Sequence, residues 1–208
     1  MKRSRLVLTV AILLLSAGGL GAAEPGTNAP ERSCCSRPET PGPFTDKSLY
    51  QLESKWTTDE GKQIKLGDLA GRLQVVVMFF ASCRYACPII VNDMKRIEAA
   101  LPSPLRARVG FTLVTFDSKR DTPAALAEYR RTRDLAADRW ALLWGKPDDV
   151  LELAQLLGVR YHEDANGQFT HSNVITLLNP QGEIVHQQIG LNQDIRETVR
   201  FIEQLAAR

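Results

Sequence analysis

Short apolar runs alternate with segments of helical periodicity over most of this 208-residue chain. Residues 75–80 form an unbroken apolar run, rich in β-branched and aromatic side chains, which predicts a strand buried on both faces. Residues 109–116 form a second run of this kind and predict a second core strand. Between the two runs, apolar side chains recur at roughly helical spacing and predict a helix; they are Ile89, Met94, Ile97 and Leu101.

Turn and capping residues predict the other elements. Thr122 followed by Pro123 has the order of an N-cap and a first helical turn, so a helix is expected from Thr122 to about Asp134. The remaining pattern predicts a hairpin over residues 49–66, a strand at 140–144, a helix at 148–157, a hairpin over 174–189 and a helix at 195–206. Strands that alternate with helices in this way imply an α/β fold with a mixed central sheet flanked by helices.

The first 23 residues differ from the rest in composition. Three basic residues, Lys2, Arg3 and Arg5, precede an apolar stretch at 6–15 and a segment of small residues that ends at Ala23. This order is typical of a secretory signal peptide, and the alternative is an uncleaved membrane anchor. We therefore expect an exported protein, in the periplasm or on the outer face of the cytoplasmic membrane, that contacts the membrane only through an uncleaved anchor.

Residues 24–48 are rich in proline and small polar residues, which predicts an extended linker before a domain at 49–208. The linker contains Cys34 and Cys35, which could stay reduced, relay a metal or electrons, or bridge elsewhere. The chain has four cysteines, which allow three full pairings, and export permits disulfide bonds. Loss of the signal peptide changes the formal net charge from +2 to −1, so no basic excess indicates nucleic-acid binding.

Cys83 and Cys87 lie directly after the first core strand, and Pro88 follows them. Because a helix start stabilises thiolates, we expect both sulfurs to ionise more readily than a free cysteine. Arg84 and Tyr85 indicate that the loop between them is at least partly exposed; the alternative is that both cysteines are packed as small apolar side chains. A spacing of three residues lets the sulfurs open around a soft ion such as Cu(I), zinc or an iron-sulfur centre.

A third ligand would complete such a site, and the chain has three histidines. His162 lies in a polar stretch and His186 within a predicted strand, so a solvated or packed side chain is expected for each. His171 comes just before the strand that begins at 174. The chain resembles the thioredoxin fold with an N-terminal β-hairpin and an inserted strand and helix, and this resemblance implies that His171 approaches the cysteine pair. The alternative is a surface histidine that only forms hydrogen bonds.

Three ordered motifs resemble the Sco (SenC) family of copper-binding assembly proteins. They are Cys83-x-x-x-Cys87-Pro88, Asp117 with Arg120-Asp121-Thr122-Pro123, and His171-Ser172 followed by Asn179-Pro180-Gln181-Gly182. The resemblance implies that Cys83, Cys87 and His171 bind copper, as Cu(I) or Cu(II), with Asp117 as a supporting residue. It also implies a metallochaperone that helps assemble a respiratory copper centre, such as that of cytochrome c oxidase. Arg84 could offset the net negative charge of two thiolates with Cu(I).

Two other functions remain open on the same residues. A thiol-disulfide oxidoreductase that acts on the cysteines of a copper protein would need only Cys83 and Cys87. A redox or copper sensor would use the linker, with Cys34 and Cys35, to contact a partner. The copper carrier ranks first, and its expected partner is a copper-accepting respiratory oxidase subunit or another exported copper protein.

Overall fold

The computed structural model describes residues 44–207. The predicted signal peptide or anchor, most of the predicted linker, and the pair Cys34 and Cys35 lie outside these described residues. Within residues 44–207, no helix combines the length and the apolar character needed to cross a membrane.

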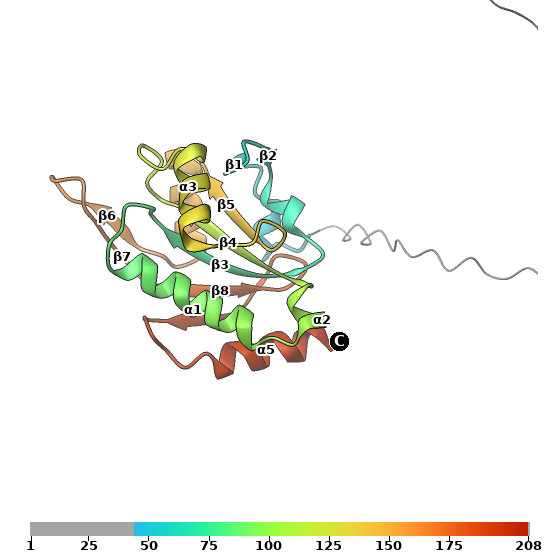
Figure 1. Cartoon of the computed structure of the whole chain (residues 1–208). Helices are drawn as coiled ribbons and strands as arrows, with labels where there is room; N and C mark the ends of the chain where they lie inside the picture. Colours follow the sequence, from blue (N-terminus) through green and yellow to red (C-terminus); the bar gives the residue numbers. More distant parts are fainter. Residues whose placement is uncertain (1–43, 208) are drawn as a thin grey trace, which may run out of the picture. The chain divides into compact units, whose positions relative to one another are not determined.

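A seven-stranded mixed sheet forms the centre of the fold, in the order β2-β1-β5-β4-β3-β8-β9 (Figure 1). Its strands are β1 (Trp56–Thr58), β2 (Gln63–Ile64), β3 (Leu73–Phe79), β4 (Val109–Thr115), β5 (Trp140–Trp144), β8 (Val174–Leu178) and β9 (Ile184–Ile189). The central strands β3, β4 and β5 run parallel, and the outer strands pair antiparallel. Two further strands, β6 (Tyr161–Glu163) and β7 (Phe169–His171), form a separate antiparallel sheet.

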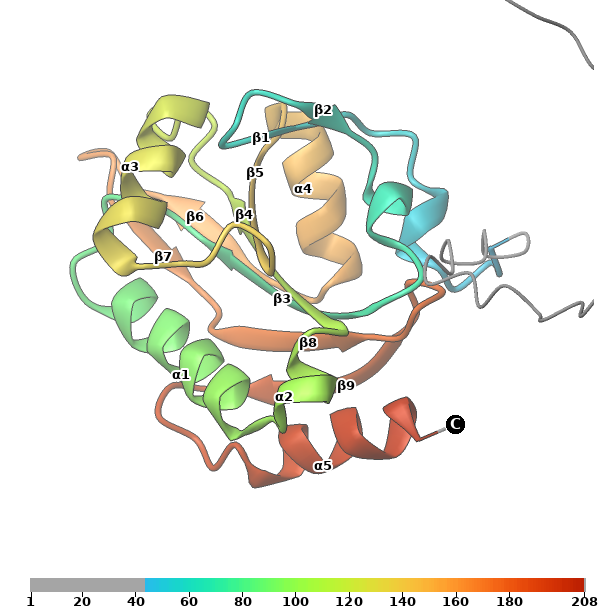
Figure 2. The ribbon, with the colours of Figure 1, turned by 45° about the vertical axis from the view of Figure 1, so that its right-hand side comes forward.

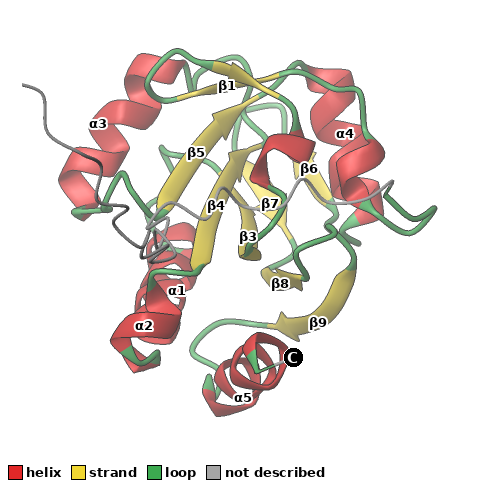
Figure 3. Ribbon diagram, turned by 90° about the vertical axis from the view of Figure 1, so that its right-hand side faces the viewer, coloured by secondary structure: helices red, strands yellow, loops and turns green. Residues whose placement is uncertain are grey.

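Helices cover both faces of the sheet. They are α1 (Ala86–Ala100), α2 (Ser103–Arg106), α3 (Pro123–Arg133), α4 (Pro147–Leu156) and α5 (Arg196–Ala206). Helices α1 and α3 lie on one side of the sheet and α4 lies on the other (Figure 3). Helix α5 packs against β9 and α1. This arrangement confirms the predicted α/β fold with a mixed sheet flanked by helices.

Strands β3 and β4 are buried along their whole length, as their largely apolar sequences predict. They pair in parallel from Leu73 opposite Val109 to Phe79 opposite Thr115. Because parallel strands end at the same edge of a sheet, the loop after β3 and the loop after β4 emerge side by side. The first loop carries Cys83, and the second carries Asp117.

The start of the domain differs from its prediction in two respects. Leu49–Gln51 forms a 3-10 turn capped by the hydroxyl of Ser48, and the first strand begins only at Trp56. The hairpin is therefore shorter than the predicted range of residues 49–66. Packed structure also extends upstream of residue 49, because the ring of Phe44 lies 5.5 Å from that of Tyr50.

Helix α1 also differs in detail from its prediction. It begins at Ala86, so Cys87 lies inside its first turn rather than before it. The buried face of the helix includes Ile90 and Val91, whereas Ile89 is only partly buried. The apolar period was therefore assigned one residue too early at this end of the helix.

The β6–β7 hairpin was not predicted. Each strand has three residues of mixed polarity, a pattern too short and too polar to be distinguished from a loop. Its existence moves His162 from a polar loop into β6 and places His171 at the end of β7. Figures 1 and 2 show the hairpin beside the start of α1.

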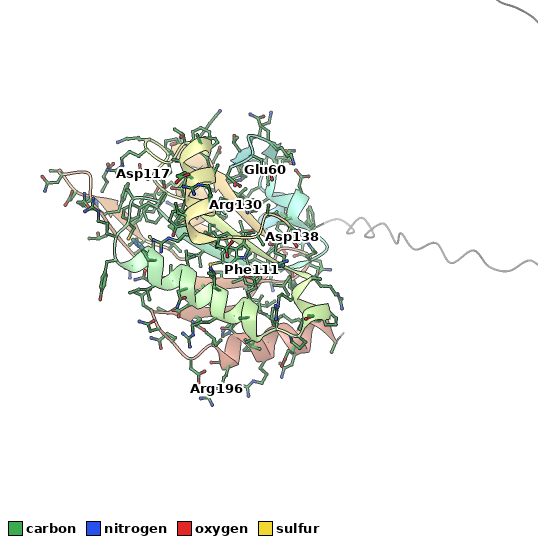
Figure 4. All side chains as sticks on the ribbon, viewed as in Figure 1. Glu60, Phe111, Asp117, Arg130, Asp138 and Arg196 are labelled. Carbon is green, nitrogen blue, oxygen red and sulfur yellow. The ribbon has the colours of Figure 1, made fainter. Side chains whose placement is uncertain are left out.

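A buried ion pair connects α3 with the turn between β1 and β2. Arg130 on α3, which is labelled in Figure 4, donates from Nη2 to Oδ1 of Asp59 at 2.7 Å and to the carbonyl of Trp140 at 2.8 Å. The side chains of Arg130 and Asp59 are only 15% and 3% exposed. Neighbouring Arg131 is 74% exposed and pairs with Glu128 along the same helix.

We expect Arg130→Ala to lower the free energy of unfolding by about 3–5 kcal/mol, because it leaves the buried Asp59 carboxylate without its partner. The matched control Arg131→Ala should change it by less than about 0.5 kcal/mol. Urea unfolding of both variants measures the difference. Equal losses would show that the Asp59–Arg130 pair does not stabilise the fold.

Candidate metal centre

The cysteine pair is held by the junction of β3 with α1. Cys87 lies in the first turn of α1 and is fully buried, whereas Cys83 in the preceding loop is partly exposed. The backbone N–H of Cys87 donates to the sulfur of Cys83 at 3.3 Å. The N-cap residue, Tyr85, makes no side-chain capping bond. The Cys83 sulfur therefore accepts a helix-start N–H that a capping oxygen would otherwise take.

His171 reaches the cysteines from the other sheet. Its Nε2 atom lies 3.7 Å from the Cys87 sulfur. Its Nδ1 atom lies 3.0 Å from the carbonyl oxygen of Ser172. An imidazole that donates from Nδ1 to a carbonyl keeps a free lone pair on Nε2, the state that a metal ligand requires. The rings of Phe80 and Phe116 flank His171, with centroids 5.9 and 5.1 Å away.

The structure thus brings together the three ligands that the sequence indicated. One ligand atom each from Cys83, Cys87 and His171 lies within 4.8 Å of the others. Metal bonds of about 2.0–2.3 Å, the range for nitrogen and thiolate ligands of zinc, place three ligands of a planar site roughly 3.5–4 Å apart. The group therefore fits a single soft ion after only a small contraction.

The ligands open into a groove of about 840 Å³. Its walls include Arg84, Tyr85 and Arg120 as well as the partly exposed ligands Cys83 and His171. Tyr85 is 77% exposed and stands between the two cysteines in the sequence. Since Cys87 is fully buried, an incoming molecule meets the site from the side of Cys83 and His171.

Comparison with known proteins identifies the family. Residues 45–207 match the family model described as SCO1/SenC. The chain belongs to the SCO1/SenC family.

Individual SCO1/SenC relatives agree with this assignment. The chain is 27% identical over 146 residues to a Stutzerimonas stutzeri protein with the provisional name of a copper-binding protein, covering 67% of this chain and 68% of the relative. It shares its fold with copper-bound ScoI of Arabidopsis thaliana, at a TM-score of 0.62 and 21% identity, covering 74% of this chain and 96% of ScoI. It is also similar to BsSco, a member of the Sco family of cytochrome c oxidase assembly proteins, at a TM-score of 0.63 and 20% identity, covering 76% and 94%. These likenesses confirm the thioredoxin-like fold.

Burial changes the expected chemistry of one SCO1/SenC cysteine. Removal from water raises the pKa of the Cys87 thiol well above its ordinary value, and the nearby Cys83 adds to this shift. The prediction that Cys87 ionises more readily than a free cysteine is therefore wrong for the metal-free protein. The cost of desolvating a thiolate outweighs the favourable potential of the helix start.

The two residues predicted to support the SCO1/SenC site lie in different surroundings. Arg84 is exposed on the wall of the groove, and no ion pair joins it to another described residue. Asp117 is buried and forms an ion pair with Arg120, rather than joining the three ligand residues. Asp117 therefore contacts Arg120, which lines the groove, and is not one of the three grouped ligand residues.

Sequence reasoning missed the role of Asp121, although this residue lies in one of the family motifs. Its buried carboxylate accepts hydrogen bonds from the backbone N–H of Ala81 at 2.8 Å and from the hydroxyl of Thr115 at 2.6 Å. Burial raises the pKa of Asp121. Asp121 thereby fixes the start of the cysteine loop, two residues before Cys83. Only its presence in the motif could have indicated this.

The other two histidines stay apart from the ligands. His162 is exposed on β6. His186 on β9 stacks on Phe201 at 4.6 Å, and its Nε2 lies 3.1 Å from the hydroxyl of Thr198. Burial lowers the pKa of His186. These placements agree with the expectation of a solvated or packed side chain for each.

The unequal burial of the cysteines predicts unequal reactivity. In the reduced, metal-free full chain, iodoacetamide should modify Cys83 at least about tenfold faster than Cys87, since each unit of raised pKa lowers the thiolate fraction tenfold. Peptide mapping by mass spectrometry at several times separates the two rates. Similar rates at both positions would contradict the buried placement of Cys87.

Proposed function

We propose that this SCO1/SenC protein carries copper as a cargo, through Cys83, Cys87 and His171, and passes it to a copper-accepting protein. The observation that carries the proposal is the meeting of these three ligands beside an open groove. Copper bound to ScoI of Arabidopsis thaliana, a protein of the same fold, supports the choice of metal.

The ligand chemistry favours copper over harder ions. Two thiolates and one neutral imidazole are soft or intermediate ligands, which suit Cu(I) and also accommodate Cu(II). Binding releases thiol protons, and the positive charge of the metal replaces the proton that burial favours on Cys87. Two thiolates with Cu(I) leave one net negative charge, and the exposed Arg84 lies on the same groove to offset it.

The geometry of the groove suits transfer. A carrier must let a recipient add a ligand before its own ligands dissociate, so part of the site must stay accessible. Cys83 and His171 are partly exposed, while Cys87 is buried behind them. The recipient therefore displaces Cys83 or His171 first, and Cys87 releases the metal last.

The proposed recipient is a respiratory copper centre such as that of cytochrome c oxidase, outside the cytoplasm. Membership of the SCO1/SenC family supports this, as does the likeness to BsSco, which belongs to a family of cytochrome c oxidase assembly proteins. The signal-like sequence of residues 1–23 supports export to the periplasm or to the outer face of the cytoplasmic membrane.

A thiol-disulfide exchange function remains the second candidate. Both Cys83 and Cys87 are free thiols, and their sulfurs lie within 4.8 Å of each other, so they could form and break a bond with little movement. Such a function would not require His171. The sensor function depends on Cys34 and Cys35, which lie outside the described residues, and stays a prediction.

The ligand set is tested by titrating the reduced full chain with Cu(I) against a chromogenic chelator. We expect one tight equivalent of Cu(I). His171→Ala should weaken its binding by more than about tenfold, because it removes a ligand rather than a residue that only orients one. His162→Ala, an exposed change on the same hairpin, and Cys34→Ser/Cys35→Ser should bind as the wild type does. If His171→Ala does not change the affinity for Cu(I), the copper-carrier function is rejected and thiol-disulfide exchange becomes the working hypothesis.

Tyr85 provides a separate test of transfer. Its exposed ring on the groove wall should contact the recipient, because tyrosine is favoured in protein interfaces. We expect Tyr85→Ala to slow copper transfer to a copper-free oxidase copper domain, without changing the affinity for Cu(I). Stopped-flow absorbance of the recipient's copper centre measures the rate. Ile189→Ala, which removes a side chain that is 74% exposed on β9, is the control; equal rates for the two variants would exclude Tyr85 as a contact.

A further inference from the structure

His171 belongs to a hairpin that the main sheet does not hold by its backbone. Among residues 44–207, β6 and β7 pair only with each other, and no backbone hydrogen bond joins them to the seven-stranded sheet. An isolated two-stranded hairpin is marginally stable in water. Apart from the short chain connection from His171 to β8, the hairpin is held to the domain by side chains. The distance between His171 and Cys87 depends on these contacts.

Arg120, which lies outside this hairpin, contacts it through its guanidinium group. Its guanidinium lies 3.7 Å from the carboxylate of Glu163 on β6 and 5.3 Å from the ring centroid of Phe169 on β7. The turn between the strands also packs on it, because a Cβ at Gly167 would lie 3.0 Å from Nη1 of Arg120. One planar group thus touches both strands and the turn.

The other side of Arg120 is anchored in the domain. Its Nε forms an ion pair with Asp117, whose side chain is only 1% exposed, and its backbone N–H donates to the same carboxylate at 3.2 Å. Asp117 lies two residues after the end of β4, and its N–H donates to the hydroxyl of Thr115 at 3.0 Å. These bonds hold the guanidinium in one position. A lysine, with its flexible stem and compact charge, would not be held in the same way.

The contacts continue from Arg120 to the histidine. Phe169, under the guanidinium, packs on Phe80 at 5.2 Å and on Phe116 at 5.1 Å. The same two rings flank the imidazole of His171. A shift of Phe169 would therefore disturb the packing that orients His171.

We propose that Arg120 is a positioning residue that fastens the β6–β7 hairpin to the domain and so keeps His171 within ligand distance of Cys87. The bridge from buried Asp117 through Arg120 to Glu163 and Phe169 carries this role. The inference deepens the proposed copper function and rests on it for the identity of the metal. The fastening of the hairpin itself exists without metal.

The first test uses the metal-free full chain and hydrogen exchange of the backbone amides. Arg120→Gln should speed exchange in residues 161–171 by about tenfold, the combined loss of a cation–π contact and a partly exposed ion pair. Amides of β3 and β4 should keep their wild-type rates, which also shows that the variant folds. Arg84→Gln is the matched control, because it removes the same charge from the same groove without touching the hairpin.

Glu163→Gln is a second variant, used in case Arg120→Gln destabilises the whole domain. It removes the surface ion pairs of Glu163 with Arg120 and with Lys119, and it leaves the buried Asp117 carboxylate paired with Arg120, so a smaller increase, about threefold, is expected. Unchanged exchange over residues 161–171 in both variants would overturn the proposal, whatever the metal affinity of the protein.

The second test is a double-mutant cycle in Cu(I) affinity. Arg120→Gln should weaken binding by about tenfold in the wild-type background and have no further effect in the His171→Ala background. Any loss caused by Arg84→Gln should be the same in both backgrounds, because it acts through charge. An Arg120 effect that persists without His171 would overturn the positioning role. If His171→Ala alone changes nothing, the proposed ligand set fails, and the hydrogen-exchange test still decides whether Arg120 fastens the hairpin.

Discussion

The buried carboxylate of Asp121 joins the loop after β3 to the loop after β4, and the metal centre is built on this junction. A buried carboxylate is costly unless it is hydrogen-bonded, and here the N–H of Ala81 and the hydroxyl of Thr115 both donate to it. The parallel register of β3 and β4 brings these groups to one edge of the sheet. The cysteine loop therefore starts from a fixed point, and helix α1 follows it with Cys87 already oriented.

The three ligands therefore differ in how firmly the fold holds them. Cys83 and Cys87 are supported by the seven-stranded sheet and by α1, through main-chain hydrogen bonds and the deep burial of Cys87. His171 stands on a small separate sheet whose strands form no backbone hydrogen bond to the seven-stranded sheet. A protein that both holds and surrenders an ion benefits from this division, because one ligand can move while the dithiol stays in place.

Much of the fold could be predicted from the sequence, because its signals are local. The runs at Val75 and Val109 have the length and the β-branched character of buried parallel strands, and Thr122 with Pro123 marks a helix start in sequence alone. The three ligands could be named because each lies in a motif beside a predictable element. The β6–β7 hairpin could not be predicted, since three-residue strands carry no period and their stability comes from contacts with Arg120 and Phe116.

The chemistry of Cys87 was mispredicted for a related reason. The helix start is visible in the sequence and favours a thiolate, whereas the burial that opposes it depends on how the hairpin and α1 pack around the sulfur. Likewise, the motif suggested a nearby role for Asp117, but only the structure shows that its buried carboxylate pairs with Arg120. Local electrostatics can be predicted from a sequence, whereas desolvation needs the three-dimensional packing.

The separation of the two sheets has an evolutionary consequence. The turn between β6 and β7 can gain or lose residues without shifting any strand of the seven-stranded sheet, since no register depends on it. The sequence of the β6–β7 hairpin can therefore change more freely than the segment with Cys83 and Cys87, which packs against the core. Descendants of such a scaffold could exchange the hairpin for one with a different third ligand, and so acquire a new metal preference or lose metal binding while retaining a working pair of thiols.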